Sequence, residues 1–266
     1  MKLFCRRYGE GPPLVILHGL YGSSDNWITI AKNISSHYTV YLPDQRNHGQ
    51  SQHDDVHDYQ SMSNDLYELA SEYRLGSFFL TGHSMGGKTA IDFALKWPGM
   101  IKGLAIADIS PFTDVTSLSE ARNKHQNILK SILETDISEA VTRKEVEDLL
   151  SVNIPSEIER IAVMKNVQRE DNKKFSWKLN ARVLLNNLDN ILEGIDRHAI
   201  DNMAVTGFPV LFLKGEKSEY LNSGDYRDIL RLFPAAEFRV IGNAGHWIHT
   251  DNPEAVSEAL VDLLAV

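Results

Sequence analysis

Cysteine is nearly missing from this chain of 266 residues, which contains Cys5 and no other. An intrachain disulfide is therefore excluded, and the composition is compatible with a reducing cytoplasm. We expect Cys5 to lie on a first strand and to contribute packing rather than chemistry.

Long apolar runs are missing as well. No stretch approaches the roughly 18 uninterrupted apolar residues of a membrane span, and the first residues lack the apolar segment of a signal peptide. These absences predict a soluble, cytoplasmic protein without membrane insertion.

Basic residues are too few and too scattered for a nucleic-acid groove. The chain carries 27 lysines and arginines against 36 aspartates and glutamates, a formal net charge of -9. No basic cluster interrupts this balance, so we expect no nucleic-acid partner. Apolar residues at 42% and charged residues at 24% are ordinary for a globular protein, and the length suits one large domain.

Short apolar runs recur along the chain and predict the strands of a parallel sheet. Their continuous Val, Ile, Leu and Phe character is typical of strands that are buried on both faces. The predicted strands are residues 14–17, 38–42, 78–81, 101–107, 209–214 and 237–241.

Helix patterns lie between these runs. Apolar residues recur at helical spacing over residues 61–74, 87–97 and 226–233, and a final helix is predicted to start near Asn252, a cap residue that is followed by proline. Alternating strands and helices predict a doubly wound α/β fold with a mostly parallel sheet.

One long polar segment, residues 111–206, interrupts this alternation. It contains helix patterns at 119–133, 138–150 and 183–195 but no convincing buried parallel strand. We interpret it as a helical lid inserted into an α/β core, since it would lie at the edge of the sheet where ligands bind. A separate helical domain is the alternative, but both flanks resemble strands of one sheet. The predicted core comprises residues 1–110 and 207–266.

The sequence Gly-His-Ser-Met-Gly at residues 82–86 follows a predicted strand and precedes a predicted helix. It predicts a nucleophile elbow, in which a sharp strand-to-helix turn exposes Ser84. Gly82 and Gly86 suit this turn because a Cβ there would strike neighbouring backbone.

The same region also matches the phosphate-binding P-loop pattern G-x-x-x-x-G-K-[ST] over residues 82–89, and Asp108 ends an apolar run as a magnesium-binding aspartate does. The two interpretations exclude each other, because a P-loop wraps backbone N–H groups around a phosphate whereas an elbow presents one hydroxyl. A P-loop leaves His246 without a use, so we favour the elbow.

A serine nucleophile needs a histidine base and an acid that orients the histidine. His246 follows the last predicted strand in Asn-Ala-Gly-His-Trp, which is the expected place of the base in the chain order Ser, acid, His. The usual place of the acid, after residues 209–214, holds Ser218. We assign the acid to Asp108, at the end of the preceding strand, with Ser218 as a candidate helper. Glu219, Glu216 and Asp225 are the alternative acids.

Two backbone N–H groups are candidates for an oxyanion hole. Met85 follows Ser84 at a helix N-terminus, and Leu20 lies in the loop after residues 14–17. We expect His18 to orient that loop through hydrogen bonds rather than to transfer protons.

A polar loop at residues 44–51 follows another predicted strand. We expect Asp44, Arg46 and Ser51 to pin it through buried hydrogen bonds. No metal site is predicted, because the spacing of zinc ligands is absent from His48, His53 and His57.

Together these blocks resemble the α/β-hydrolase superfamily, and within it the branch of YbfF-like bacterial esterases and a related abhydrolase-domain protein of animal mitochondria. Arg-Asn-His-Gly at residues 46–49, where many relatives carry Arg-Gly-x-Gly, narrows the resemblance to this branch. The resemblance implies a serine esterase whose acid follows the sixth strand, with Ser218 in the place of the usual acid, and so supports Asp108. It covers nearly the whole chain through residues 18–23, 44–49, 82–88, 107–111 and 243–249.

The predicted function is hydrolysis of a small-molecule carboxylic ester through an acyl-enzyme on Ser84, with His246 as base, Asp108 as acid and no cofactor. Thioester hydrolysis, carbon–carbon bond hydrolysis and perhydrolysis are alternatives on the same scaffold. A ligand-binding module without catalysis is a further alternative, but such proteins usually lose a triad member. The motifs specify neither the acyl-chain length nor the oligomeric state.

Overall fold

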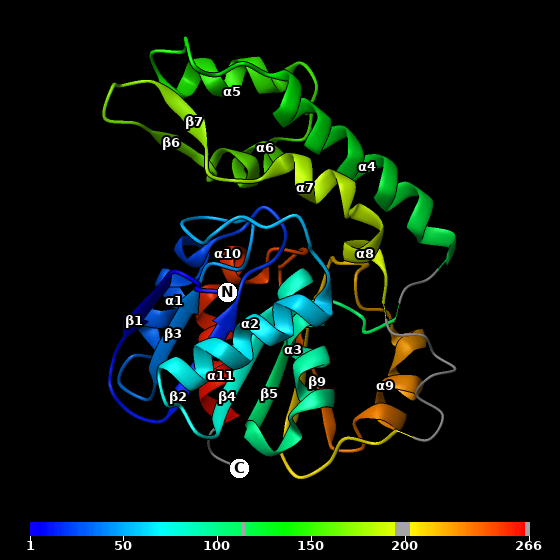
Figure 1. Cartoon of the computed structure of the whole chain (residues 1–266). Helices are drawn as coiled ribbons and strands as arrows, with labels where there is room; N and C mark the ends of the chain where they lie inside the picture. The colour runs from blue at the N-terminus through cyan, green and yellow to red at the C-terminus, as the bar shows by residue number, and fades with distance from the viewer. Residues whose placement is uncertain (113–114, 195–202, 264–266) are drawn as a thin grey trace.

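The protein was analysed as a computed structural model, which describes residues 1–112, 115–194 and 203–263. A seven-stranded sheet forms its centre, in the order β1-β3-β2-β4-β5-β8-β9 (Figure 1). β1 pairs antiparallel with β3, and every other pairing in this sheet is parallel. The strands are β1 (Cys5–Tyr8), β2 (Pro13–Leu17), β3 (Thr39–Pro43), β4 (Phe78–His83), β5 (Ile101–Ala107), β8 (Val210–Gly215) and β9 (Ala236–Ile241).

Both faces of the sheet are buried, as the continuous apolar runs predict. On β2, Val15 and Leu17 belong to one hydrophobic cluster, whereas Leu14 and Ile16 belong to another. Helices α2 (Tyr59–Glu72), α3 (Met85–Lys96) and α9 (Tyr226–Leu232) contribute to the first cluster, and α1 (Ile28–Asn33) and α11 (Pro253–Asp262) to the second. The predicted doubly wound α/β fold is therefore confirmed.

Cys5 lies on β1, as predicted. Burial raises the pKa of its thiol to about 12, which disfavours the reactive thiolate. Among helices in the described ranges, none combines the length and apolar character that crossing a bilayer requires.

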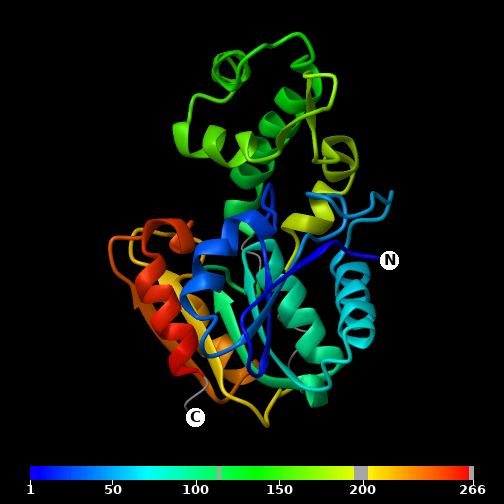
Figure 2. The ribbon, with the colours of Figure 1, turned by 90° about the vertical axis from the view of Figure 1, so that its left-hand side faces the viewer.

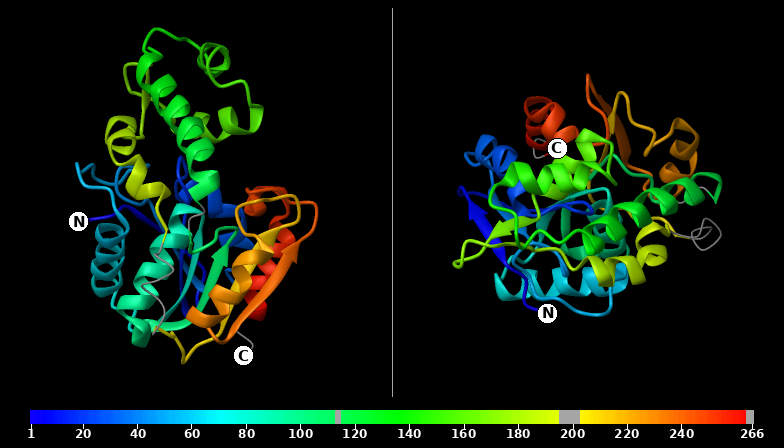
Figure 3. Two further views of the ribbon diagram at one scale, coloured as in Figure 1. Left: turned by 90° about the vertical axis from the view of Figure 1, so that its right-hand side faces the viewer. Right: turned by 90° about the horizontal axis from the view of Figure 1, so that it is seen from above.

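The segment between β5 and β8 sits above one end of the α/β layers (Figure 2, Figure 3). We refer to residues 115–194, the described part of this segment, as the lid. The division into a core of residues 1–110 and 207–266 and a lid of residues 111–206 stays a prediction. The lid contains five helices within the described residues and one antiparallel hairpin. They are α4 (Val115–Glu134), α5 (Arg143–Ser151), α6 (Glu157–Met164), β6 (Val167–Arg169), β7 (Phe175–Trp177), α7 (Ala181–Asn186) and α8 (Leu188–Leu192).

Two predicted lid helices have wrong bounds. The helix predicted for residues 138–150 begins at Arg143, because the Thr142 side chain caps it by accepting a hydrogen bond from Glu145 N. The helix predicted for 183–195 is divided into α7 and α8 at Asn187, where the backbone leaves the helical conformation. Residue 195 lies outside the described residues.

Candidate active site

Ser84 stands at the junction of β4 and α3 with a φ of 52°, a conformation that L-residues rarely adopt. Two glycines make this turn possible. A Cβ on Gly82 would lie 2.1 Å from Gly86 O, and a Cβ on Gly86 would lie 2.5 Å from His18 O. The backbone therefore has the strained, close-packed geometry of an elbow, and strain of this kind is typical of functional positions.

Lys88 separates the elbow from the P-loop alternative. A P-loop would direct this side chain at a phosphate, but here Lys88 Nζ donates to the lid carbonyls of Leu192 at 2.9 Å and Glu193 at 2.6 Å. Burial lowers the pKa of Lys88 to about 8. The lysine thus connects the helix behind Ser84 to the end of α8.

His246 joins Ser84 to Asp108. It lies in the loop after β9, where its Nε2 is 3.1 Å from Ser84 Oγ and its Nδ1 is 2.8 Å from Asp108 Oδ2. The imidazole is 18% exposed, whereas the Asp108 side chain is fully buried. Residues that are up to 162 positions apart in the sequence therefore form one continuous chain of polar contacts.

Asp108 is held by β8 as well as by His246. Its Oδ1 accepts a hydrogen bond from Gly215 N at 2.8 Å, and its Oδ2 also accepts one from Ser218 Oγ. These hydrogen bonds replace the ones that the buried carboxylate would make to water in the unfolded chain. The side chains of the alternative acids Glu216 and Glu219 belong to exposed residues.

Two further residues, which the sequence analysis missed, position His246. The Tyr220 ring stacks on the imidazole with centroids 3.7 Å apart and planes 18° apart. On the backbone side, His83 Nε2 donates to His246 O at 2.8 Å. Tyr220 follows Ser218 by two residues, so the loop after β8 supports both the carboxylate and the imidazole.

Leu20 N and Met85 N donate no hydrogen bond within the part of the chain that the structure describes. Met85 is the first residue of α3, where backbone N–H groups have no intrahelical acceptor. The loop that carries Leu20 lies against the elbow, since a Cβ on Gly19 would be 3.1 Å from Ser84 Cβ.

His18 holds that loop through both ring nitrogens, as predicted. Gln45 N donates to its Nε2 at 2.9 Å, so Nδ1 carries the proton and donates to Gly19 O at 2.9 Å. Burial lowers the pKa of His18, which suits this neutral tautomer. Because both nitrogens are engaged with backbone, His18 has an orienting role.

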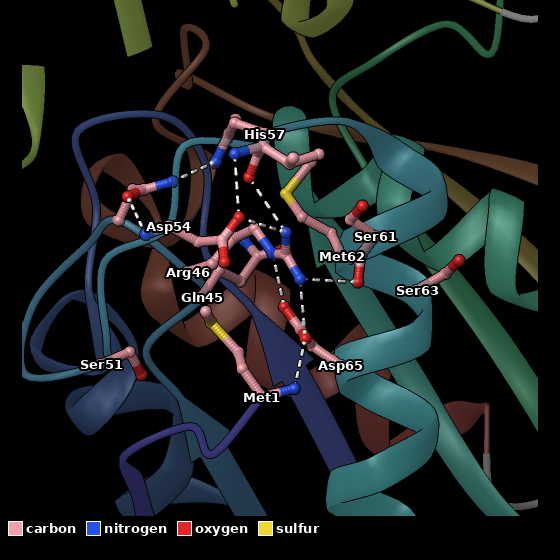
Figure 4. A network of polar contacts seen from close by, with 12 residues as sticks. Met1, Gln45, Arg46, Ser51, Asp54, His57, Ser61, Met62, Ser63 and Asp65 are labelled. Atoms are coloured by element: carbon pink, nitrogen blue, oxygen red, sulfur yellow. Dashed lines mark hydrogen bonds and ion pairs between the residues drawn. The ribbon is translucent and has the colours of Figure 1, made fainter. Parts of the chain in front are cut away.

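The loop after β3 is pinned by the buried polar contacts predicted for it, and Figure 4 shows those of Arg46. Arg46 forms a bidentate pair with Asp65 of α2, with Nε 2.6 Å from Oδ2 and Nη2 2.9 Å from Oδ1. Asp44 accepts from Ser24 N at 2.6 Å, and its backbone O accepts from Ser51 Oγ at 2.5 Å. Within the described ranges, no three or more His, Cys, Asp or Glu side chains gather as a metal site would require.

Asn47 in the same loop binds the lid. Asn180 N donates to Asn47 O at 3.0 Å, and Asn180 Nδ2 donates to Asn47 Oδ1 at 3.2 Å. Asn47 is fully buried and has a φ of 65°, which asparagine tolerates better than most residues. Within the Arg-Asn-His-Gly pattern, Asn47 therefore binds the lid, whereas Arg46 binds Asp65 of the core.

The lid and the site share one hydrophobic cluster. From the core, Leu20, Tyr21, Met62 and Met85 belong to it, together with buried lid residues of α4 to α8. Of these four core residues, Leu20 and Met85 carry the two backbone N–H groups that donate no hydrogen bond in the described structure. Met85, the residue after Ser84, thus packs in one apolar cluster with the lid.

Comparison with known proteins decides the family. The model of the family described as alpha/beta hydrolase fold matches residues 12–253. This chain belongs to the α/β-hydrolase fold family. The family predicted from the sequence is confirmed.

Three similar proteins show which α/β-hydrolases this chain resembles. An sn-1-specific diacylglycerol lipase, ABHD11, of Danio rerio is 36% identical over 262 residues, covering 96% of this chain and 79% of that protein. Esterase YbfF of Escherichia coli is 29% identical over 249 residues, covering 93% and 91%. The solved structure of a marine microorganism esterase superposes with a TM-score of 0.91 at 42% identity and covers 98% and 99%. The predicted resemblance to the YbfF-like branch is confirmed.

Five buried histidines and the half-buried His125, all among the described residues of this α/β-hydrolase, resist protonation. Burial lowers the pKa to about 3 for His57 and His83 and to about 4 for His125. An unfolded histidine takes up its proton at about pH 6.5. Below that pH the unfolded state binds more protons than the folded state, so stability falls as the pH falls. The other three are His18, His48 and His249.

We expect this hydrolase to unfold cooperatively in mild acid. At about pH 5 a histidine whose folded pKa is about 3 or 4, such as His57, His83 or His125, costs the fold about 2 kcal/mol relative to neutral pH. Three such costs are a large part of the ~5–15 kcal/mol of a typical domain. Circular dichroism across a pH series would locate the midpoint. His249→Phe should move it to lower pH, because neither ring nitrogen of His249 has a partner in the described structure and the ring stacks on Trp27.

His37→Phe is the control for this experiment, because His37 is exposed. It should leave the midpoint unchanged. If His249→Phe and His37→Phe unfold at the same pH as the unaltered chain, buried neutral histidines do not set the acid limit.

Proposed function

We propose that this α/β-hydrolase is a serine esterase that cleaves small-molecule carboxylic esters through an acyl-enzyme on Ser84. The observation that carries the proposal is the bridge made by His246, between Ser84 Oγ at 3.1 Å and Asp108 Oδ2 at 2.8 Å. A hydroxyl, an imidazole and a buried carboxylate in this order are the groups that acyl transfer through serine requires. The names of the similar esterases support the same reaction.

In the proposed acylation step, His246 Nε2 takes the proton of Ser84 as Oγ attacks the ester carbonyl carbon. The carbonyl π electrons move to oxygen and form a tetrahedral oxyanion. When this collapses, the bond to the alcohol oxygen breaks and His246 returns the proton to the leaving alcohol. Deacylation repeats the sequence with water as the nucleophile, which releases the acid and restores Ser84.

Asp108 is the proposed acid. Its Oδ2 lies where it can accept the Nδ1 proton of His246, so it holds the imidazole with Nε2 facing Ser84 and stabilises the imidazolium during the reaction. Ser218 and Gly215 N donate to the same carboxylate and keep it oriented. We therefore assign Ser218 a supporting role.

The oxyanion hole is assigned to Leu20 N and Met85 N. Both donors are without acceptors in the described structure, and Met85 adds the positive end of α3. Each such donor typically stabilises the transition state by about 2.7–4 kcal/mol. No cofactor or metal has a part in the proposed reaction.

The proposed substrate class is an ester with an apolar acyl group. The shared cluster of Leu20, Met62 and Met85 with the lid favours apolar substituents next to the reacting carbonyl. A series of p-nitrophenyl esters and acyl-CoA thioesters of graded chain length would separate esterase from thioesterase activity. We expect ester turnover to exceed thioester turnover at equal chain length; the reverse order would make the protein a thioesterase.

An acyl-enzyme predicts a pre-steady-state burst. Stopped-flow mixing with a p-nitrophenyl ester should release about one equivalent of nitrophenol per active site before steady turnover, if deacylation is the slower step. A fluorophosphonate should label the chain once, and peptide mass spectrometry should place the adduct on Ser84. Labelling at another residue would contradict the proposed nucleophile.

A further inference from the structure

The loop that carries Leu20 contains a strained turn. Gly22 N donates to Gly19 O at 2.9 Å and closes a turn over residues 19–22. Tyr21, the third residue of this turn, has a φ of 63°. A positive φ at this place alone marks a type II turn, which usually has glycine or asparagine there. A bulky residue keeps this conformation only where its surroundings hold it.

This turn also sets the direction of Leu20 N–H. Gly19 O accepts hydrogen bonds from Gly22 N and from His18 Nδ1, both at 2.9 Å. Because the peptide bond is planar and trans, Leu20 N–H points away from Gly19 O. Any change in the turn therefore changes where this N–H lies relative to Ser84.

Two lid residues hold Tyr21 from outside the turn. Asn166, which follows α6 and is 1% exposed, donates from Nδ2 to Tyr21 O at 2.7 Å. His125 of α4 has its Nδ1 3.1 Å from the Tyr21 hydroxyl, and the two rings are 5.7 Å apart. Backbone and side chain of Tyr21 are thus bound by residues that lie 145 and 104 positions later in the chain.

We propose that the lid completes the oxyanion hole, with Asn166 and His125 as positioning residues that act through Tyr21 on Leu20 N. This inference rests on the proposed function. The lid contacts oppose relaxation of the positive φ at Tyr21, and so they keep the turn in the form that presents Leu20 N–H beside Ser84. Neither residue is assigned a contact with substrate. Docking of the lid and assembly of the oxyanion site are consequently one event.

The test is Asn166→Asp, which has nearly the same shape but cannot donate to Tyr21 O. We expect kcat to fall about ten- to hundred-fold, while KM changes less than about two-fold. Complete loss of one oxyanion donor lowers kcat by about 10²–10³-fold, and here the donor is only displaced. A trifluoromethyl ketone, which forms a hemiketal oxyanion on the nucleophile, should lose affinity by the same factor as kcat. The matching methyl ketone, which binds without this oxyanion, should keep its affinity.

Asn187→Asp is the matched control. Asn187 Nδ2 also connects the lid to the core, since it donates to Val183 O at 2.9 Å and to Asp55 O at 3.0 Å, but it does not touch the turn at residues 19–22. This variant should keep wild-type kcat and the full preference for the trifluoromethyl ketone. Equal losses in both variants would assign Asn166 to general lid stability and overturn the proposal.

Tyr21→Phe is a second variant, which tests the same proposal if Asn166→Asp does not fold. It removes the hydroxyl that contacts His125 and should lower kcat and trifluoromethyl ketone affinity together, by several-fold. Unchanged values in a folded variant overturn the proposal. If the unaltered protein itself does not prefer the trifluoromethyl ketone over the methyl ketone, the proposed serine esterase mechanism fails instead.

Discussion

Ser84→Ala is expected to abolish ester hydrolysis, with kcat/KM for short p-nitrophenyl esters falling about a million-fold, as in serine hydrolases that lose their nucleophile. The Oγ that lies 3.1 Å from His246 Nε2 is the atom proposed to form the acyl-enzyme, and alanine offers no replacement. Residual turnover would come from the oxyanion site and from binding alone. Initial rates at substrate concentrations below KM measure the effect.

The fold of this variant should be intact, because alanine at the strained φ of 52° meets the same backbone constraint as serine. Thermal melting within a few degrees of the unaltered protein would show this. Ser131→Ala is a matched control, since Ser131 is a buried lid serine whose hydroxyl donates to Asn127 O. Wild-type turnover in Ser84→Ala would refute the proposed nucleophile.

Asp108→Asn is expected to lower kcat about 10⁴-fold while the fold persists. An asparagine amide has the shape of the carboxylate, but it cannot carry the charge that stabilises the imidazolium. It also favours the wrong tautomer, because an amide N–H facing His246 Nδ1 would place the ring proton on Nε2. Steady-state kinetics of the purified variant measure the loss.

Glu219→Gln provides the comparison for the acid. Glu219 is exposed and belongs to the same loop as Ser218, so its neutralisation should change kcat less than about two-fold. If this variant is crippled and Asp108→Asn is not, the acid has been assigned to the wrong strand.

Much of the fold could be predicted from local sequence. Continuous apolar runs indicated the parallel strands because a strand buried on both faces has no polar side. The order of Ser84, Asp108 and His246 suggested one site, because parallel strands end at the same edge of the sheet. The topology of the sheet was enough to predict that these three residues lie together, and the details of side-chain packing were not needed.

The contacts between the lid and the core could not be predicted in this way. The bonds from Asn180 to Asn47 and from Asn166 to Tyr21 join residues 133 and 145 positions apart, and no sequence period connects them. The positive φ at Tyr21 gave no signal either, because a tyrosine there is held by tertiary contacts against its own preference. The stacking of Tyr220 on His246 likewise depends on how the β8 loop folds back.

The convergence of two strand ends on one carboxylate has an evolutionary consequence. Asp108 follows β5 and Ser218 follows β8, and their side chains meet beside the same imidazole nitrogen. Asp108, the proposed acid, and Ser218 therefore lie at neighbouring positions, and a carboxylate at either one could face this nitrogen. Substitutions at these two positions alone would move the proposed acid from one strand to the next, with Ser84, His246 and the sheet unchanged. A relative whose acid follows β8 would then differ from this chain at two positions and not in the order of its strands.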